Sequence, residues 1–157
     1  STATGRMVMQ YATENIIPVT LELGGKSPNV FFESVMDHDD AFLDKAIEGA
    51  VLFALNQCEI CTCPSRLLIQ ESIYDKVIAR VIERVDAIKV GDPLDPTVMM
   101  GAQASKIQKD KILSYIKLGK EEGAEVLTGG DVNQVGEGFE EGYYIKPTLL
   151  KGHLSIS

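Results

Sequence analysis

Residues 67–88 read LLIQESIYDKVIARVIERVDAI, a short apolar run followed by apolar residues at a helical spacing. The three consecutive apolar residues at 67–69 are typical of a buried strand. The positions after them predict an amphipathic helix whose apolar face carries Ile73, Val77, Val81, Val85 and Ile88. A buried strand leading directly into such a helix is the repeating unit of an α/β fold.

The same alternation continues on both sides of this unit. Upstream, residues 30–32 read as a strand, and an apolar stripe over 43–54 predicts a helix with aspartates at its N-terminal end. Downstream, Ser105 and Gln108 have the spacing of a capping box that begins a helix. Short extended segments at 125–127 and 143–150 follow. Together these elements predict an α/β fold with a largely parallel sheet and helices on both faces.

Composition excludes several classes of function. The chain has 157 residues, 45% of them hydrophobic, which is enough for a packed core. Fifteen basic and 23 acidic side chains give a net charge of −8, so nucleic acid and anionic membranes are not expected as partners. No apolar run approaches the roughly 20 residues of a membrane span. Three cysteines, all within residues 58–63, indicate a reducing compartment, and we expect a cytoplasmic protein.

Two short motifs carry the chemistry. Residues 21–29 read LELGGKSPN, which places the carboxylate of Glu22 beside a glycine pair. Residues 56–66 read NQCEICTCPSR, which supplies thiols, including that of Cys61. A thiol and a carboxylate that folding brings together can form a covalent adduct and then use a water to break it.

In this order, the two motifs resemble the glutamate and cysteine motifs of the NAD(P)-dependent aldehyde dehydrogenase family. The version around Cys61, with Glu59 before it and residues 70–74 after it, resembles the bacterial acetaldehyde-type branch. The likeness covers residues 1 to about 150. It implies that residues 1–23 are the C-terminal end of an NAD-binding domain and residues 24–150 a portion of the catalytic domain. Residues 151–157 then form an irregular tail.

The resemblance assigns the two motifs to separate steps of an oxidation. Cys61 becomes the nucleophile, attacking an aldehyde to form a thiohemiacetal and, after oxidation, a thioester. Glu22 becomes the general base that activates water to release a carboxylic acid. Without the resemblance, Cys61 would be read as a small buried hydrophobic residue and Glu22 as a solvated carboxylate.

The resemblance also implies a cofactor site. Ser1 and Gly5 match the end of a phosphate-binding stretch at a helix N-terminus, where free N–H groups face the pyrophosphate. Leu23 and Gly24 match positions whose backbone lies beside the nicotinamide. The expected cofactor is NAD, with NADP left open. The expected partners are a small-molecule aldehyde and, for the parent enzyme, further copies of itself.

The chain departs from the family pattern at Cys58, where the family has glycine. A side chain there, or a positive φ that cysteine tolerates poorly, is expected to shift the nucleophile loop. The substitution also creates a Cys58-x-x-Cys61 spacing, so the alternative function is a thiol redox module that uses these two cysteines. Packing is the expected role of Cys63, and no metal site is expected because the chain does not supply four suitably spaced ligands.

Two further expectations concern the surface and the activity of the chain. The glycine- and acid-rich stretch 131–141 is expected to be a solvated loop. The asparagine that completes the family's oxyanion site has no counterpart in this sequence. The isolated chain is therefore expected to be an inactive fragment that neither binds NAD tightly nor turns over.

Overall fold

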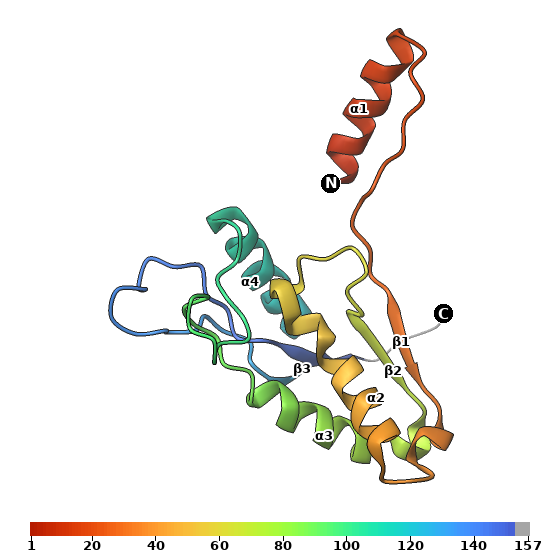
Figure 1. Cartoon of the computed structure of the whole chain (residues 1–157), viewed down its shortest axis with the longest axis vertical. Coiled ribbons are helices and arrows are strands. Elements are labelled where there is room, and N and C mark those ends of the chain that lie inside the picture. The colour runs from red at the N-terminus through yellow and green to blue at the C-terminus, as the bar shows by residue number, and fades with distance from the viewer. Residues whose placement is uncertain (153–157) are drawn as a thin grey trace.

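The computed structural model describes residues 1–152, apart from the side chains of Leu55 and Asn56. Helices and short strands form a body, from which one helix and an extended segment project as an arm (Figure 1). The order of elements is α1 (Thr2–Glu14), β1 (Pro28–Phe31), η1 (Glu33–Met36), α2 (Ala41–Val51), η2 (Leu52–Cys58), β2 (Arg66–Ile69), η3 (Glu71–Ile73), α3 (Tyr74–Asp86), α4 (Lys106–Glu121), β3 (Glu125–Thr128) and β4 (Leu149–Lys151).

The first pair of strands is parallel, as an α/β fold requires. Pro28 of β1 pairs with Arg66 of β2, and Phe31 pairs with Ile69. Parallel neighbours need a crossover connection, and α2 provides it. The predicted α/β fold is therefore confirmed, and both predicted strands lie within one or two residues of their expected bounds.

Side chains that cap the helices explain where they begin. The Asp40 carboxylate accepts hydrogen bonds from the backbone N–H of Phe42 (2.8 Å) and of Leu43 (3.2 Å) at the start of α2. Ser105 Oγ accepts from Gln108 N–H (3.1 Å) at the start of α4. Both caps satisfy N–H groups that have no partner within the helix, and both follow the sequence prediction.

The core lies between the first sheet and the two helices that follow its strands. Helices α2 and α3 pack against each other. The largest fully buried side chains of the described residues belong to these helices, and the predicted apolar stripes supply all four: Leu43, Ile47, Val77 and Val81. Because a buried aliphatic side chain contributes about 1.5–3 kcal/mol, this cluster is the main source of the body's stability.

The second sheet corrects the prediction for residues 143–150. β3 and β4 pair in antiparallel fashion, and β4 begins only at Leu149. Before it, Ile145 forms an isolated bridge with Val132. Pro147 lacks the N–H that a continuous ladder would need, so the strand is broken just before β4.

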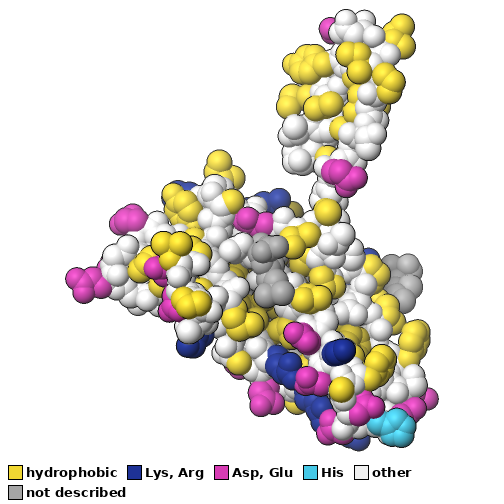
Figure 2. Space-filling view, in the orientation of Figure 1, with side chains coloured by type: hydrophobic (Ala, Val, Ile, Leu, Met, Phe, Trp, Pro, Cys, Tyr) yellow, Lys and Arg dark blue, Asp and Glu magenta, His cyan; other side chains and the backbone are white. Residues whose placement is uncertain are grey.

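The arm consists of α1 and the extended residues 15–27 (Figure 1). Its apolar side chains are largely exposed and form yellow patches on the projecting part of Figure 2. Among them, Ile16 is 90% and Tyr11 is 68% exposed. The predicted division of the chain near residue 24 remains a prediction. None of the helices within residues 1–152 has the length and apolar character needed to cross a bilayer.

Candidate active site

Strand pairing brings the two motifs together. Residues 21–27 lead into β1 and residues 58–65 lead into β2, and the strands are parallel, so both motifs enter the sheet from the same edge. Strand partners are 38 positions apart, as Pro28 and Arg66 show, which nearly matches the 39 positions between Glu22 and Cys61. The register of the sheet therefore explains why segments distant in sequence meet.

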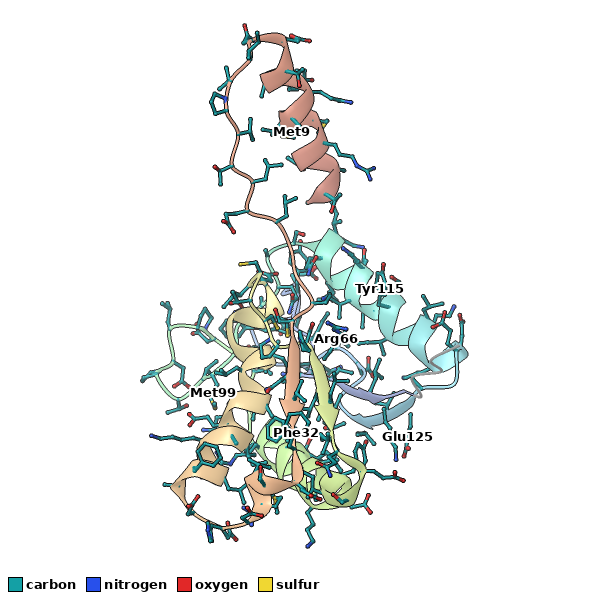
Figure 3. The ribbon with its side chains drawn as sticks, turned by 90° about the vertical axis from the view of Figure 1, so that its right-hand side faces the viewer. Met9, Phe32, Arg66, Met99, Tyr115 and Glu125 are labelled. Carbon is teal, nitrogen blue, oxygen red and sulfur yellow. The ribbon has the colours of Figure 1, made fainter. Side chains whose placement is uncertain are left out.

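Arg66 ties the two segments at this edge, where Figure 3 labels it beside the start of β1. Its Nε donates to the Lys26 carbonyl (2.8 Å), and its backbone N–H donates to the Ser27 carbonyl (3.3 Å). The bond from the charged guanidinium to the Lys26 carbonyl is the stronger of the two. The last residue of the cysteine motif thus holds the end of the glutamate motif.

Gly25 lies close against the Cys61 backbone. A β-carbon added at Gly25 would lie 2.5 Å from the carbonyl oxygen of Cys61, closer than real β-carbons come to backbone atoms. The absence of a side chain at Gly25 is therefore a packing requirement. Cys61 itself is exposed, in a turn closed by a hydrogen bond from Cys63 N–H to the Ile60 carbonyl (3.1 Å).

Replacing Gly25 with alanine is expected to lower the free energy of unfolding by about 1–3 kcal/mol, the usual cost of overpacking. The neighbouring Gly24 is a matched control, since a β-carbon there would meet nothing within 4 Å. Gly24→Ala should change stability by less than about 0.5 kcal/mol. Urea denaturation of both variants measures the difference. Equal midpoints would show that the Gly25 contact is not needed.

Cys58 lies in strained backbone, as its place in the motif predicts. Gln57 has φ of 56° and Cys58 has φ of 63°, both in the left-handed region that favours glycine. Such conformations cost of order 1–3 kcal/mol per residue and persist only where the surroundings hold them. The cysteine thus retains a glycine-like conformation at an energetic cost.

The three thiols differ in their surroundings. Part of Cys58 is exposed, but its thiol contacts that of the buried Cys63. Desolvation, reinforced by Cys63, raises the pKa of the Cys58 thiol to about 12 from an ordinary value of 9.0. Burial also raises the pKa of Cys63, whose Sγ donates to the Phe53 carbonyl (3.6 Å). A protonated Cys58 paired with Cys63 does not support the alternative of a Cys58–Cys61 redox pair.

The glutamate motif also contacts the arm helix. A β-carbon at Gly5, the buried residue of α1, would lie 3.2 Å and 3.3 Å from the two methyl groups of Leu23. A Leu21 methyl group would lie 3.5 Å from the same β-carbon. Since alternate side chains of an extended segment point to opposite sides, Glu22 faces away from α1. It is exposed, and among residues 1–152 its carboxylate has no hydrogen-bond or ion-pair partner.

The residues expected to hold a dinucleotide surround this contact. Ser1 caps α1, with its Oγ accepting from Thr4 N–H (3.3 Å), and the first turn carries no acidic side chain to repel a phosphate. Gly24 faces open space. A helix N-terminus without acidic residues, and a glycine with room beside it, fit a pyrophosphate and a flat ring. Within the described part of the chain, no group of three or more His, Cys, Asp or Glu side chains is placed to hold a metal ion.

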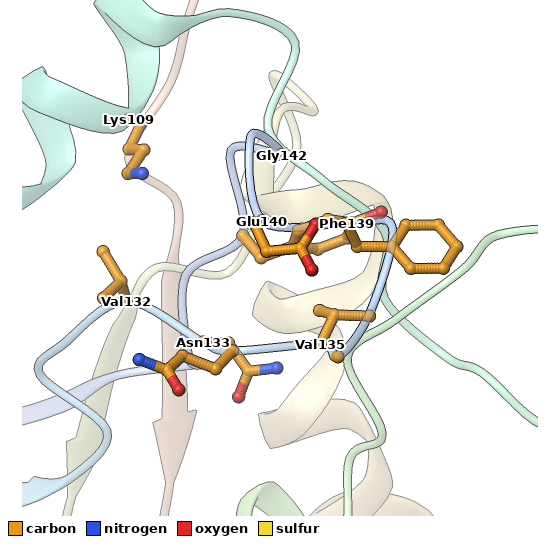
Figure 4. Close-up of a pocket in the computed structure, with 10 residues that line it drawn as sticks. Lys109, Val132, Asn133, Val135, Phe139, Glu140 and Gly142 are labelled. Atoms are coloured by element: carbon orange, nitrogen blue, oxygen red, sulfur yellow. The ribbon is translucent and has the colours of Figure 1, made fainter.

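Two features of the structure are absent from the sequence interpretation. Gln103 is buried and contacts Gln57, although no periodicity or motif distinguishes it in the sequence. The loop expected to be only a solvated surface lines a cavity of about 440 Å³ with Lys109 and Tyr144 (Figure 4). None of the residues predicted for catalysis or cofactor binding lines that cavity.

Comparison with known proteins shows what this chain is similar to. A family model described as the aldehyde dehydrogenase family matches residues 1–155. An aldehyde dehydrogenase of Deinococcus radiodurans is 67% identical over 152 residues, and acetaldehyde dehydrogenase 2 of Cupriavidus necator is 62% identical over 152 residues. Each match covers 97% of this chain, which spans 29% and 30% of these two relatives.

A solved structure shares the fold as well. The NAD⁺ complex of a Bacillus cereus aldehyde dehydrogenase superposes with a TM-score of 0.83 at 37% identity, covering 96% of this chain and 28% of that one. The motifs, the fold and the relatives agree along nearly the whole sequence. The chain belongs to the aldehyde dehydrogenase family.

Proposed function

We propose that this chain supplies the nucleophile and the general base of an enzyme that oxidises an aldehyde to a carboxylic acid with NAD. The observation that carries the proposal is the contact between Gly25 and the Cys61 carbonyl, which joins the two motifs at one edge of the sheet. In this proposal residues 1–23 end the NAD-binding domain and residues 24–150 belong to the catalytic domain. NADP remains open as the cofactor.

Cys61 performs the first step. Its sulfur, as thiolate, forms a bond to the aldehyde carbon, and the carbonyl π electrons move to oxygen to give a thiohemiacetal oxyanion. The Cys61 backbone N–H is proposed to stabilise that oxyanion. An exposed thiol in a turn is open to a small substrate, whereas Cys63 is buried and the thiol of Cys58 has a raised pKa of about 12.

The cofactor, when bound, supplies the acceptor for the hydride that leaves the thiohemiacetal carbon, so that a thioester remains on Cys61. Ser1 and Gly5 are proposed to place its pyrophosphate at the start of α1. Leu23 and Gly24 are proposed to bound the nicotinamide, since Gly24 has open space where a side chain would stand.

Glu22 performs the last step. Its carboxylate takes a proton from a water whose oxygen attacks the thioester carbon, and Cys61 leaves as thiolate with release of the acid. Three extended residues span at most about 10 Å, which bounds the separation of Glu22 from Gly25 at the Cys61 turn. A general base needs to reach only the attacking water, so the Glu22 carboxylate has no need to touch the sulfur.

The proposal is tested by following the covalent intermediate. Acetaldehyde and NAD are added to the longest natural polypeptide that carries this sequence and, in parallel, to the 157-residue chain. From the longer polypeptide we expect aldehyde-dependent NADH formation and, after an acid quench, an acetyl group on the peptide that contains Cys61, whereas the 157-residue chain should not turn over. Turnover with no acyl group on Cys61, or with one on Cys58 or Cys63, would refute the assignment.

A further inference from the structure

The backbone just before Cys61 is held in a conformation that it would not adopt alone. Two consecutive residues, Gln57 and Cys58, have left-handed φ values at the end of η2. Non-glycine residues stay in this region only where neighbouring structure fixes them. Because η2 ends at Cys58, the contacts that hold these two residues in this conformation must come from other parts of the chain.

Residues 101–104, which we call the 101–104 segment, provide these contacts. Gln103 Nε2 donates to the Gln57 carbonyl (3.4 Å), and Ala104 N–H donates to Glu59 Oε1 (3.0 Å). Gly101 allows a close approach, since a β-carbon there would lie 3.0 Å from Gln57 Nε2. The segment therefore holds the residues on both sides of Cys58.

The 101–104 segment is itself anchored on the body. Just before it, Met100 is buried in the core and donates its N–H to the Lys89 carbonyl (3.1 Å). Gln103 N–H donates to the Tyr143 carbonyl (2.9 Å), and Ser105 caps α4. Because hydrogen bonds and packing hold both ends and the middle of the 101–104 segment, the segment can hold residues 57–59 in place.

The burial of Gln103 points to a purpose other than stability. The residue is only 4% exposed, and its Oε1 is the one buried side-chain oxygen or nitrogen without a partner among the described residues. An unsatisfied buried acceptor lowers stability, and an apolar side chain of similar volume would avoid that cost. Its side-chain amide nevertheless donates a hydrogen bond to the Gln57 carbonyl in the strained loop.

We propose that Gln103 and Glu59 are positioning residues that hold the left-handed backbone before Cys61 and so place its thiol for attack. This inference rests on the proposed role of Cys61 as nucleophile. Neither side chain is assigned contact with the substrate. Gln103 acts through the Gln57 carbonyl, and Glu59 acts through the Ala104 N–H.

Substitutions at the two positions test the proposal in the full 157-residue chain. Gln103→Met keeps the volume and removes the amide, and Glu59→Ala removes the acceptor. Glu59→Gln retains an oxygen that can accept from Ala104 and is the conservative rescue. Gln134→Met, at an exposed glutamine, is the matched control. The readouts are hydrogen exchange of peptides across residues 52–63, acylation of Cys61 by p-nitrophenyl acetate, and the melting temperature.

For Gln103→Met and Glu59→Ala we expect faster hydrogen exchange across residues 52–63 and slower acylation of Cys61. Each rate should change by about three- to tenfold, the scale of one lost hydrogen bond. Melting of Gln103→Met should be unchanged or raised, while Glu59→Gln and Gln134→Met should match the parent chain. Unchanged exchange or acylation in both loss variants would overturn the proposal. Faster exchange throughout the core with a lower melting temperature would also overturn it, by showing a merely structural role.

The Glu59→Ala and Glu59→Gln pair carries the test if Gln103→Met does not fold. Acylation by an activated ester needs only the thiol, so this assay is independent of NAD and of aldehyde oxidation. Failure of the longest natural polypeptide that carries this sequence to oxidise aldehydes, with the loop effects present, would refute the proposed function and leave the positioning inference intact.

Discussion

Replacing Cys61 with alanine is expected to abolish aldehyde oxidation, with a loss of roughly 10⁴-fold or more, the scale seen when an enzyme loses a covalent nucleophile. Without the sulfur, no thiohemiacetal forms and the aldehyde hydrogen has no route to leave as hydride. The measurement is aldehyde-dependent NADH formation by the longest polypeptide that carries this sequence. Circular dichroism of the variant checks that the fold is retained, as expected for an exposed residue.

Cys58→Gly is the matched control for this prediction. It removes a thiol three residues away and relieves a left-handed backbone at φ 63°. Since the raised pKa of about 12 keeps the Cys58 thiol protonated near neutral pH, its loss should leave oxidation intact or increase it. Activity that survives in Cys61→Ala and disappears in Cys58→Gly would show that Cys58, and not Cys61, is the reactive thiol.

Much of the fold follows from local sequence patterns. The aspartates before α2 and Ser105 before α4 predict helix starts because their side chains satisfy N–H groups that every helix leaves open. The apolar spacing over α3 predicts its buried face. The resemblance of the two motifs to aldehyde dehydrogenases is confirmed by the family match and the relatives.

The parts that could not be predicted depend on contacts between distant segments. Nothing local to residues 143–150 shows that the strand is limited to Leu149–Lys151, because that depends on pairing with β3. The need for glycine at position 25 depends on a carbonyl 36 positions later. Gln103 has no local signal, since its burial and its contact with Gln57 exist only once the chain has folded.

The strained loop before Cys61 depends both on local sequence and on contacts between distant segments. The family's glycine at the position of Cys58 suggests a left-handed backbone, and the structure shows it at Cys58 and also at Gln57. Sequence reasoning therefore identified the strain but not the residues that maintain it. The thiol pairing also depends on the fold, because the buried Cys63 lies against Cys58. Spacing alone had suggested Cys61 as the partner.

Glu22→Gln is expected to separate the two halves of the proposed reaction. The amide is nearly isosteric but cannot accept a proton, so hydrolysis of the thioester should slow by roughly 10²- to 10⁴-fold, the usual contribution of a general base. Attack by Cys61 and the first hydride transfer do not need this carboxylate. The variant should therefore give a burst of about one NADH per site, followed by slow turnover, with the acyl group accumulating on Cys61.

Rapid-quench mass analysis of the Cys61 peptide, together with stopped-flow measurement of NADH, would follow both phases. Glu14→Gln is the matched control, because Glu14 is an exposed carboxylate at the end of α1 that has no proposed role. A missing burst in Glu22→Gln would mean that Glu22 acts before hydride transfer, for example as the base that ionises Cys61. Full steady-state turnover would mean that another group activates the water. Only a retained burst with slow release places Glu22 at hydrolysis, the step that the proposed function assigns to this exposed carboxylate.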